Sequence, residues 1–210
     1  ARNLVATGAR PLALTDCLNF ANPERPEVMW QFSEAVDGIA EACRALGVPV
    51  VSGNESFYNE TDGRPIPPTP AIGMVGLLDD VKTSTSIAFK ASGDVVMQVG
   101  VGERTLAGSE YAAALHNIVA GLPPALDWDV EKRTNTFVLE IACKELLASC
   151  HDVSDGGLAV ALAECALAGS PTRLGASITL PRQDERADVT LFGEGGGTFI
   201  VTLRPDKLQE

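Results

Sequence analysis

The sequence predicts a mixed α/β fold built in two layers. Short apolar runs with strand character alternate along the chain with segments whose apolar residues recur at helical spacing. The 210 residues are 45% hydrophobic and 21% charged, which is the balance of an ordinary globular protein. No repeat of solenoid length is visible. A chain of this length is long enough for two modest domains or one large one.

The first part of the chain predicts a strand, a helix and two further strands. The run PLALT at 11–15 is short and apolar and comes shortly after Gly8, which is typical of a buried strand. Pro26 suits the first turn of the following helix, and further strands are expected at Val48–Ser52 and Ala71–Leu78, with a polar loop at 54–70 between them. The helix has apolar residues at steps of four and three and ends at a glycine: Phe32, Val36, Ile39, Cys43, Leu46 and Gly47.

The polar run KTSTS at 82–86 predicts a boundary, which divides the chain into domains at 1–82 and 83–210. The second domain again alternates between strand and helix patterns. Apolar residues at helical spacing predict helices after Ser109, around Val138 and over Gly156–Ala168. Strands are expected at four places: Asp94–Val101, Ser177–Leu180, Val189–Phe192 and Phe199–Leu203.

Charge and cysteine content exclude several functional classes. The net charge is −12 and the isoelectric point is about 4.6, which argues against a surface for nucleic acid or anionic membrane. No apolar run approaches the roughly 20 residues that span a bilayer. Five scattered cysteines without zinc-ligand or CxxC spacing fit reduced thiols, so we expect a cytoplasmic protein.

Two polar blocks near the start are the main candidates for a functional site. Asp16 follows the predicted strand PLALT, where an aspartate either caps a turn or faces a nucleotide or metal. SGNESFYNE at 52–60 follows the next predicted strand, and a simple turn does not need so many polar groups. Asn54 offers a neutral oxygen to Mg²⁺, Ser56 offers a hydroxyl to a substrate, and Gly53 permits close backbone approach.

Two later motifs carry weaker signals. HDVSDGGLA at 151–159 predicts a helix start capped by Ser154 or Asp155, and either this loop caps itself or its acids hold a cation. LFGEGGG at 191–197 either cradles a ligand or forms a bulge between strands. It is not a P-loop, because the Lys-Ser/Thr pair of a P-loop does not follow the glycines.

Together these blocks resemble the synthetase-subunit family of phosphoribosylformylglycinamidine synthase, in its second pseudo-symmetric half. The blocks TDCLNF, SGNESFYNET, PTPAIGMVGLLDDV, GSEY, HDVSDGGLAVALAE and LFGEGGG occur in the order typical of that family and span nearly the whole chain. The resemblance implies two domains like those of aminoimidazole ribonucleotide synthetase, namely part of a barrel-forming domain and a second α/β sandwich. It also implies an ATP- and Mg²⁺-dependent ligase that converts formylglycinamide ribonucleotide to the amidine with glutamine-derived ammonia in purine biosynthesis.

The same resemblance suggests roles for individual residues. Asp16 and Gly53 are expected to contact ATP, Asn54 to bind Mg²⁺ and Ser56 to contact the ribonucleotide. Asp152 is expected to serve an auxiliary nucleotide site, by pseudo-symmetry alone. No catalytic residue is assigned, since the catalytic histidine of the family lies in the first half. Family members commonly carry Gly in place of Ala21 and Val in place of Glu55, and Glu55 either points away from the site or weakens phosphate binding.

The resemblance also sets expectations for assembly and leaves rival functions open. Because the chain starts inside the second half, we expect a fragment that is inactive alone and that self-associates as a dimer. Its expected partners are a glutaminase subunit and a small accessory subunit, and neither nucleic acid nor membrane. Two rivals remain: another ATP-dependent synthetase or kinase of the superfamily, and a non-catalytic assembly or nucleotide-binding module.

Overall fold

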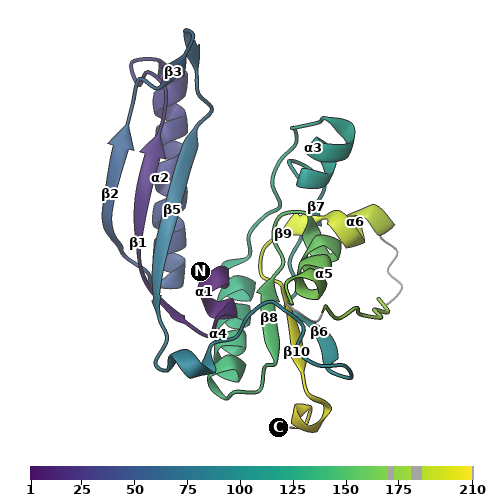
Figure 1. Ribbon diagram of the computed structural model, residues 1–210. Helices are drawn as coiled ribbons and strands as arrows, with labels where there is room; N and C mark the ends of the chain where they lie inside the picture. Colours follow the sequence, from purple (N-terminus) through teal and green to yellow (C-terminus); the bar gives the residue numbers. More distant parts are fainter. Residues whose placement is uncertain (170–172, 181–185, 210) are drawn as a thin grey trace. The chain divides into compact units, whose positions relative to one another are not determined.

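The chain folds into two compact units of mixed α/β structure, as predicted (Figure 1). The computed structural model describes residues 1–169, 173–180 and 186–209. The smaller unit is Arg10–Leu77, and the larger unit joins Ala1–Ala9 to Leu78–Glu210. The first helix, α1 (Arg2–Ala6), therefore packs with the later part of the chain. The domain division at residue 82 stays a prediction.

The smaller unit is a three-stranded sheet with one long helix on it (Figure 1). The strand order is β2-β1-β5, with β1 and β2 parallel and β5 antiparallel to β1. A two-stranded hairpin lies between β2 and β5. The elements are β1 (Arg10–Asn19), α2 (Pro26–Leu46), β2 (Val50–Ser56), β3 (Glu60–Thr61), β4 (Arg64–Pro65) and β5 (Thr69–Leu77).

Helix α2 covers one face of this sheet. Its apolar side contributes Val28, Phe32 and Ile39 to a cluster with Leu18 and Phe20 of the β1 segment. This confirms Phe32 and Ile39 of the predicted helix face, whereas Val36 is 39% exposed. The rings of Phe20 and Phe32 meet edge-on with centroids 5.4 Å apart, a favourable aromatic geometry. Gly47 ends the helix in the left-handed conformation with φ 67°, as predicted.

The strands of the smaller unit run further than their apolar residues suggest. The strand predicted at 11–15 extends to Asn19, and the next extends to Ser56, so most of the polar blocks lies inside strands. The expected loop at 54–70 is correspondingly shorter, and it includes the β3–β4 hairpin. Ladder pairing between β1 and β2 continues through the polar residues because backbone groups, not side chains, make those bonds.

The larger unit is a three-stranded sheet between helices. The strand order is β6-β10-β8, and β10 is antiparallel to both neighbours. A second, two-stranded sheet joins β7 to β9. The remaining elements are η1 (Val81–Thr83), β6 (Val95–Val99), β7 (Arg104–Thr105), α3 (Glu110–His116), α4 (Trp128–Cys143), β8 (Ser149–Asp152), α5 (Gly157–Leu167), α6 (Ala187–Phe192), β9 (Glu194–Gly195), β10 (Phe199–Leu203) and η2 (Pro205–Lys207).

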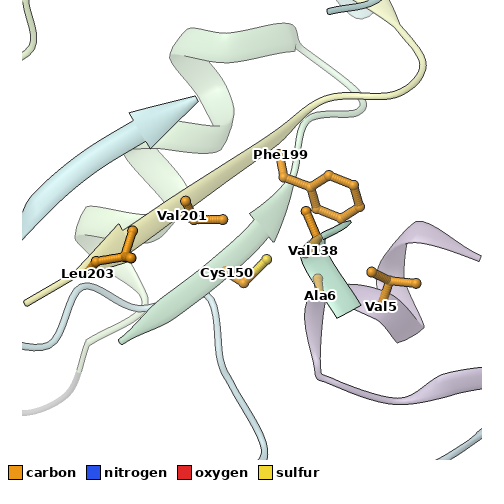
Figure 2. Close-up of a cluster of buried hydrophobic side chains, with 7 residues drawn as sticks. All are labelled: Val5, Ala6, Val138, Cys150, Phe199, Val201 and Leu203. Atoms are coloured by element: carbon orange, nitrogen blue, oxygen red, sulfur yellow. The ribbon is translucent and has the colours of Figure 1, made fainter. Parts of the chain in front are cut away.

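The core of the larger unit has a cluster on each face of β10. Alternate residues of the strand point to opposite faces, and all five are buried. Figure 2 shows one cluster, in which side chains from α1, α4, β8 and β10 meet: Val5, Ala6, Val138, Cys150, Phe199, Val201 and Leu203. Ile200 faces the other way, into a cluster with Leu158 and Cys165 of α5. The sheet is therefore covered on both faces.

Two strand predictions in this unit are wrong. Val189–Phe192 lies in helix α6, where the Phe192 ring stacks on Tyr111 with centroids 5.0 Å apart. A four-residue apolar run does not distinguish helix from strand by its period, so packing decides. Ser177–Leu180 forms no strand, although it lines a pocket with β6. The strand predicted at 94–101 is present as β6, and that at 199–203 is β10.

Candidate functional site

Asp16 and Gly53 lie side by side on the neighbouring strands β1 and β2. They are partners in the parallel register, and a Cβ atom built on Gly53 would fall 1.7 Å from Asp16 Oδ1. The aspartate carboxylate therefore lies directly over the Gly53 backbone, and only glycine leaves room for it. Leu18, two residues after Asp16, packs against α2, so this pair lies on the helix side of the sheet.

Asn54 and Ser56 lie on the opposite, open side of the same sheet. They pair with Cys17 and Asn19 of β1, which alternate with Asp16 and Leu18. The structure thus brings the four predicted residues onto one strand pair but divides them between its two faces. Glu55 alternates with Asn54 and Ser56, so its carboxylate lies on the other face of the strand pair, the face that carries Asp16 and Gly53.

Ser56 is held by a hydrogen-bonded turn at the end of β2. Asn59, three residues on, contacts its hydroxyl and its carbonyl oxygen, and the Phe20 N–H donates to the same carbonyl at 2.9 Å. A pocket of about 530 Å³ opens next to this turn. Asn19, the register partner of Ser56, is one of its lining residues. A polar pocket at strand ends is a suitable place for a small, hydrogen-bonding ligand.

Asn54 supplies only part of what Mg²⁺ requires. Mg²⁺ prefers six oxygen ligands, commonly including one or two carboxylates and substrate phosphates. Asn54 is exposed and offers one neutral oxygen, and Ser52 and Ser56 are its neighbours on the open side of β2. Across the described residues, no group of three or more His, Cys, Asp or Glu side chains has a metal-binding arrangement. Asn54 fits as one ligand of a metal whose other ligands come from elsewhere.

Asp152 is a buried carboxylate at the end of β8, with 7% of its surface exposed. Its Oδ1 lies 3.6 Å from His151 Nδ1, and the Ser154 hydroxyl donates to its Oδ2 at 3.4 Å. The side-chain amide of Asn3, with its nitrogen facing Asp152, donates to the same Oδ2 at 2.8 Å. Burial alone would raise the pKa of Asp152, but His151, a backbone N–H and Arg2 together outweigh it and the pKa is lowered. The carboxylate is thus already satisfied by protein groups. The auxiliary site stays a prediction.

The acid of LFGEGGG has a role that the sequence did not predict. Glu194 Oε1 accepts hydrogen bonds from the backbone N–H of Gly156 at 2.8 Å and of Glu110 at 2.7 Å. It therefore caps the amino ends of α5 and α3 together, and neither Ser154 nor Asp155 caps α5. Glu194 of this motif thus joins the amino ends of two helices. The only sign of this role in the sequence is a single acidic residue among glycines.

Close backbone approach explains a glycine of this motif. A Cβ on Gly195 would lie 2.0 Å from the Glu103 carbonyl oxygen, so the β7–β9 pairing requires glycine there. LFGEGGG thus has a structural part in this pairing, but it is not a bulge between two strands, because its first two residues lie in helix α6.

Comparison with known sequences identifies two family domains. The sequence model described as "AIR synthase related protein, N-terminal domain" matches residues 1–78. That described as "AIR synthase related protein, C-terminal domain" matches residues 91–210. In the described part of the chain, no helix is long and apolar enough to cross a membrane.

Similar proteins are subunits of one synthase. The chain is 52% identical over 210 residues to the phosphoribosylformylglycinamidine synthase subunit PurL of Anaeromyxobacter sp. (strain Fw109-5), covering 97% of this chain and 27% of that protein. It is 50% identical to PurL of Moorella thermoacetica, covering 98% and 28%. The chain thus spans little more than a quarter of these relatives.

Solved structures confirm the fold. The structure described as T. maritima PurL complexed with FGAR aligns with a TM-score of 0.68 at 21% identity, covering 99% of this chain and 34% of that one. At this identity the likeness concerns the fold alone. With one family domain over residues 1–78 and the other over 91–210, the chain belongs to the AIR synthase related protein family.

Proposed function

We propose that this chain is part of the synthetase subunit of a phosphoribosylformylglycinamidine synthase. The intact enzyme would convert formylglycinamide ribonucleotide, ATP and glutamine-derived ammonia to the amidine, ADP and phosphate, a step of purine biosynthesis. The observation that carries the proposal is the 52% identity to a PurL subunit across 210 residues. Identity at that level over both family domains favours a shared reaction over a shared fold only.

Within this proposal, the two faces of the β1–β2 pair have different tasks. Asp16 and Gly53 contact ATP, and the fit of the carboxylate over the glycine supports a role for them as a unit. Asn54 contributes one oxygen to Mg²⁺, and Ser56 contacts the ribonucleotide. Mg²⁺, when bound, neutralises phosphate charge during phosphoryl transfer. The catalytic histidine lies outside this chain, so the isolated chain should be inactive.

Nucleotide binding by the intact protein tests these assignments. Asp16→Ala and Asn54→Ala should each lower turnover and weaken Mg-ATP binding, measured by calorimetry and by phosphate release. Asp37→Ala, which removes an exposed carboxylate from the solvent side of α2, is the matched control and should leave both unchanged. Full turnover in both site variants would overturn the site assignment.

Two rival functions make different predictions. Another synthetase or kinase of the superfamily would hydrolyse ATP with a different acceptor. A non-catalytic assembly module would bind nucleotide without hydrolysing it, or not bind it at all. ATP hydrolysis that depends on both formylglycinamide ribonucleotide and an ammonia source would exclude both rivals. A rate of ATP hydrolysis that does not change when the ribonucleotide is added would exclude the proposed reaction.

The proposal includes protein partners. One solved relative is described as "Structure of PurLQS from Thermotoga maritima", and its TM-score with this chain is 0.63. We infer a glutaminase subunit and a small accessory subunit as partners here, in the cytoplasm. The open face of the small sheet exposes Val75 by 61%, which supports self-association of the isolated chain through this unit. Light scattering that finds a monomer at high concentration would contradict the dimer.

A further inference from the structure

The side chain of Asn59 joins the ends of strands β1 and β2. Its Nδ2 donates to the Phe20 carbonyl oxygen at 3.0 Å and to the Ser56 carbonyl oxygen at 2.8 Å. The Asn59 backbone N–H also donates to Phe20, and the Tyr58 N–H donates to Ala21. One amide thus fixes the two polar blocks at the point where both strands end.

These two carbonyls determine which way the Asn59 amide faces. A carbonyl oxygen can only accept, so the group facing both must be the NH₂ and not the amide oxygen. An NH₂ group has two hydrogens, and the two carbonyls take both of them. Nδ2 also lies 3.1 Å from Ser56 Oγ, but no hydrogen remains for that contact.

The orientation of Asn59 in turn directs the hydroxyl of Ser56. Asn59 Oδ1 lies 3.2 Å from Ser56 Oγ and accepts its proton. A hydroxyl has one proton to donate and two lone pairs that accept. Once the proton is held by Asn59, the hydroxyl has only acceptor capacity left for another molecule. Asn59, whose amide contacts this hydroxyl, also lines a pocket with Asn19 and Thr69.

We propose that Asn59 is a positioning residue that makes Ser56 a hydrogen-bond acceptor toward the substrate. Ser56 then recognises a donor on the ribonucleotide, a ribose hydroxyl or an amide N–H, and not a phosphate oxygen, which could only accept. This inference rests on the proposed function, because it assumes that Ser56 contacts the ribonucleotide. It adds the direction of the hydrogen bond and the residue that sets that direction.

A double-mutant cycle in the full-length protein tests the coupling. Formylglycinamide ribonucleotide binding is measured by calorimetry for the unsubstituted protein, Ser56→Ala, Asn59→Ala and the double variant. Loss of one hydrogen bond should weaken binding by about 3- to 10-fold in each single variant. The double variant should bind no more weakly than Ser56→Ala, because Asn59 acts through Ser56. Losses that multiply in the double variant would overturn the inference.

Asn22→Ala is the matched control for local structure. Asn22 also bonds the backbone near these strands, accepting from the Glu24 N–H at 2.8 Å, but has no hydrogen bond to Ser56. It should lower thermal stability slightly and leave ribonucleotide binding unchanged. If Asn22→Ala weakens binding as much as Asn59→Ala, a general loss of local order explains both and the inference fails.

A second measurement needs no Asn59 variant, in case that variant does not fold. Ribonucleotide analogues that lack single donors, the 2′-deoxy, 3′-deoxy and N-methylamide forms, are titrated into the unsubstituted protein and Ser56→Ala. One analogue should bind about 3- to 10-fold more weakly to the unsubstituted protein and show no such loss with Ser56→Ala. The riboside that lacks the phosphate is titrated in the same way. If it is the only analogue whose loss of binding disappears with Ser56→Ala, Ser56 is a donor to the phosphate and the inference is wrong.

The two proposals fail in different ways. If the unsubstituted full-length protein does not bind the ribonucleotide, the proposed function is wrong and the inference falls with it. If the unsubstituted protein binds it and the cycle shows independent losses, the function stands and only the role of Asn59 is wrong.

Discussion

The Asp16 carboxylate occupies the space that a side chain on Gly53 would need. A Cβ on Gly53 would approach Asp16 Oδ1 to 1.7 Å and Asp16 Cγ to 2.8 Å. The two residues come from strands separated by a long helix, and the parallel register between β1 and β2 brings them together. Glycine is required at position 53 because it leaves room for the Asp16 carboxylate. It is not required for a turn, since Gly53 lies within strand β2.

Gly53→Ala should therefore displace Asp16. We expect a loss of about 1–3 kcal/mol in the free energy of unfolding, the usual cost of overpacking, measured by denaturant unfolding. The loss should largely disappear in an Asp16→Ala background, because the atoms that clash are then absent. Gly38→Ala is the control: nothing lies within 4 Å of its Cβ, and alanine in this helix should stabilise by about 0.5–1 kcal/mol. Equal losses in both backgrounds would contradict the account.

Arg2 and Glu131 form a largely buried ion pair between α1 and α4. Arg2 Nη1 lies 2.9 Å from Glu131 Oε1, and the Glu131 side chain is only 6% exposed. Removal of Arg2 leaves this carboxylate buried with no positive partner in the pair, so Arg2→Ala should cost about 3 kcal/mol of unfolding free energy.

A surface pair gives the control for this prediction. Arg204 and Asp206, 3.4 Å apart, are both more than 60% exposed, and Arg204→Ala should cost less than about 1 kcal/mol. Chemical denaturation of the four proteins (the unsubstituted chain, Arg2→Ala, Arg204→Ala and the double variant) measures both effects. Similar small losses from both substitutions would show that α1 is not held by this pair.

The sequence predicts the order of strands and helices well where the spacing of apolar residues agrees with the positions of glycine and proline. Gly47 ends α2 where glycine and proline follow the apolar face, and the strand at 199–203 is apolar apart from Thr202 and buried throughout. The prediction fails at Val189–Phe192, because a run this short does not show a period. The segment is helical, and the ring of its Phe192 stacks on Tyr111. It also ends β1 and β2 too early, because apolar content marks burial and not the extent of backbone pairing.

The candidate site could be located from the sequence, but its geometry could not. Residue chemistry selected Asp16, Gly53, Asn54 and Ser56, and the parallel register does place them on adjacent strands. Which face each side chain takes depends on where a strand begins and on the irregularity between Leu14 and Thr15. The hydrogen bonds of Asn59 and Glu194 join residues from separate strands and helices, and single-sequence patterns do not contain such partners.

The five cysteines should differ sharply in reactivity, because the thiolate is the reactive form. Burial raises the pKa of Cys150 to about 12 and that of Cys165 to about 11, whereas Cys143 is exposed. Iodoacetamide at pH 8 should label Cys143 first and should reach Cys150 and Cys165 only after unfolding. Peptide mass spectrometry identifies the sites, and Cys143→Ser should remove the fastest label. Rapid labelling of Cys150 in the folded protein would contradict its burial.

His151 should make stability depend on pH. Its Nε2 lies 2.7 Å from Glu164 Oε2 and its Nδ1 lies 3.6 Å from Asp152 Oδ1, so two carboxylates face one ring. The nearby Asp152 carboxylate raises the pKa of His151, burial opposes it, and Glu164 adds to the increase. The folded state therefore holds the proton more tightly than the unfolded state does.

The sign of the effect follows from that difference. The stabilisation is fully present below the unfolded pKa of 6.5 and is lost as pH rises through the higher folded pKa. His151→Gln should thus destabilise more at about pH 5.5 than at about pH 9. The free energy of unfolding, measured by urea at both pH values, tests this. A pH-independent loss for His151→Gln would show that the ring contributes packing alone.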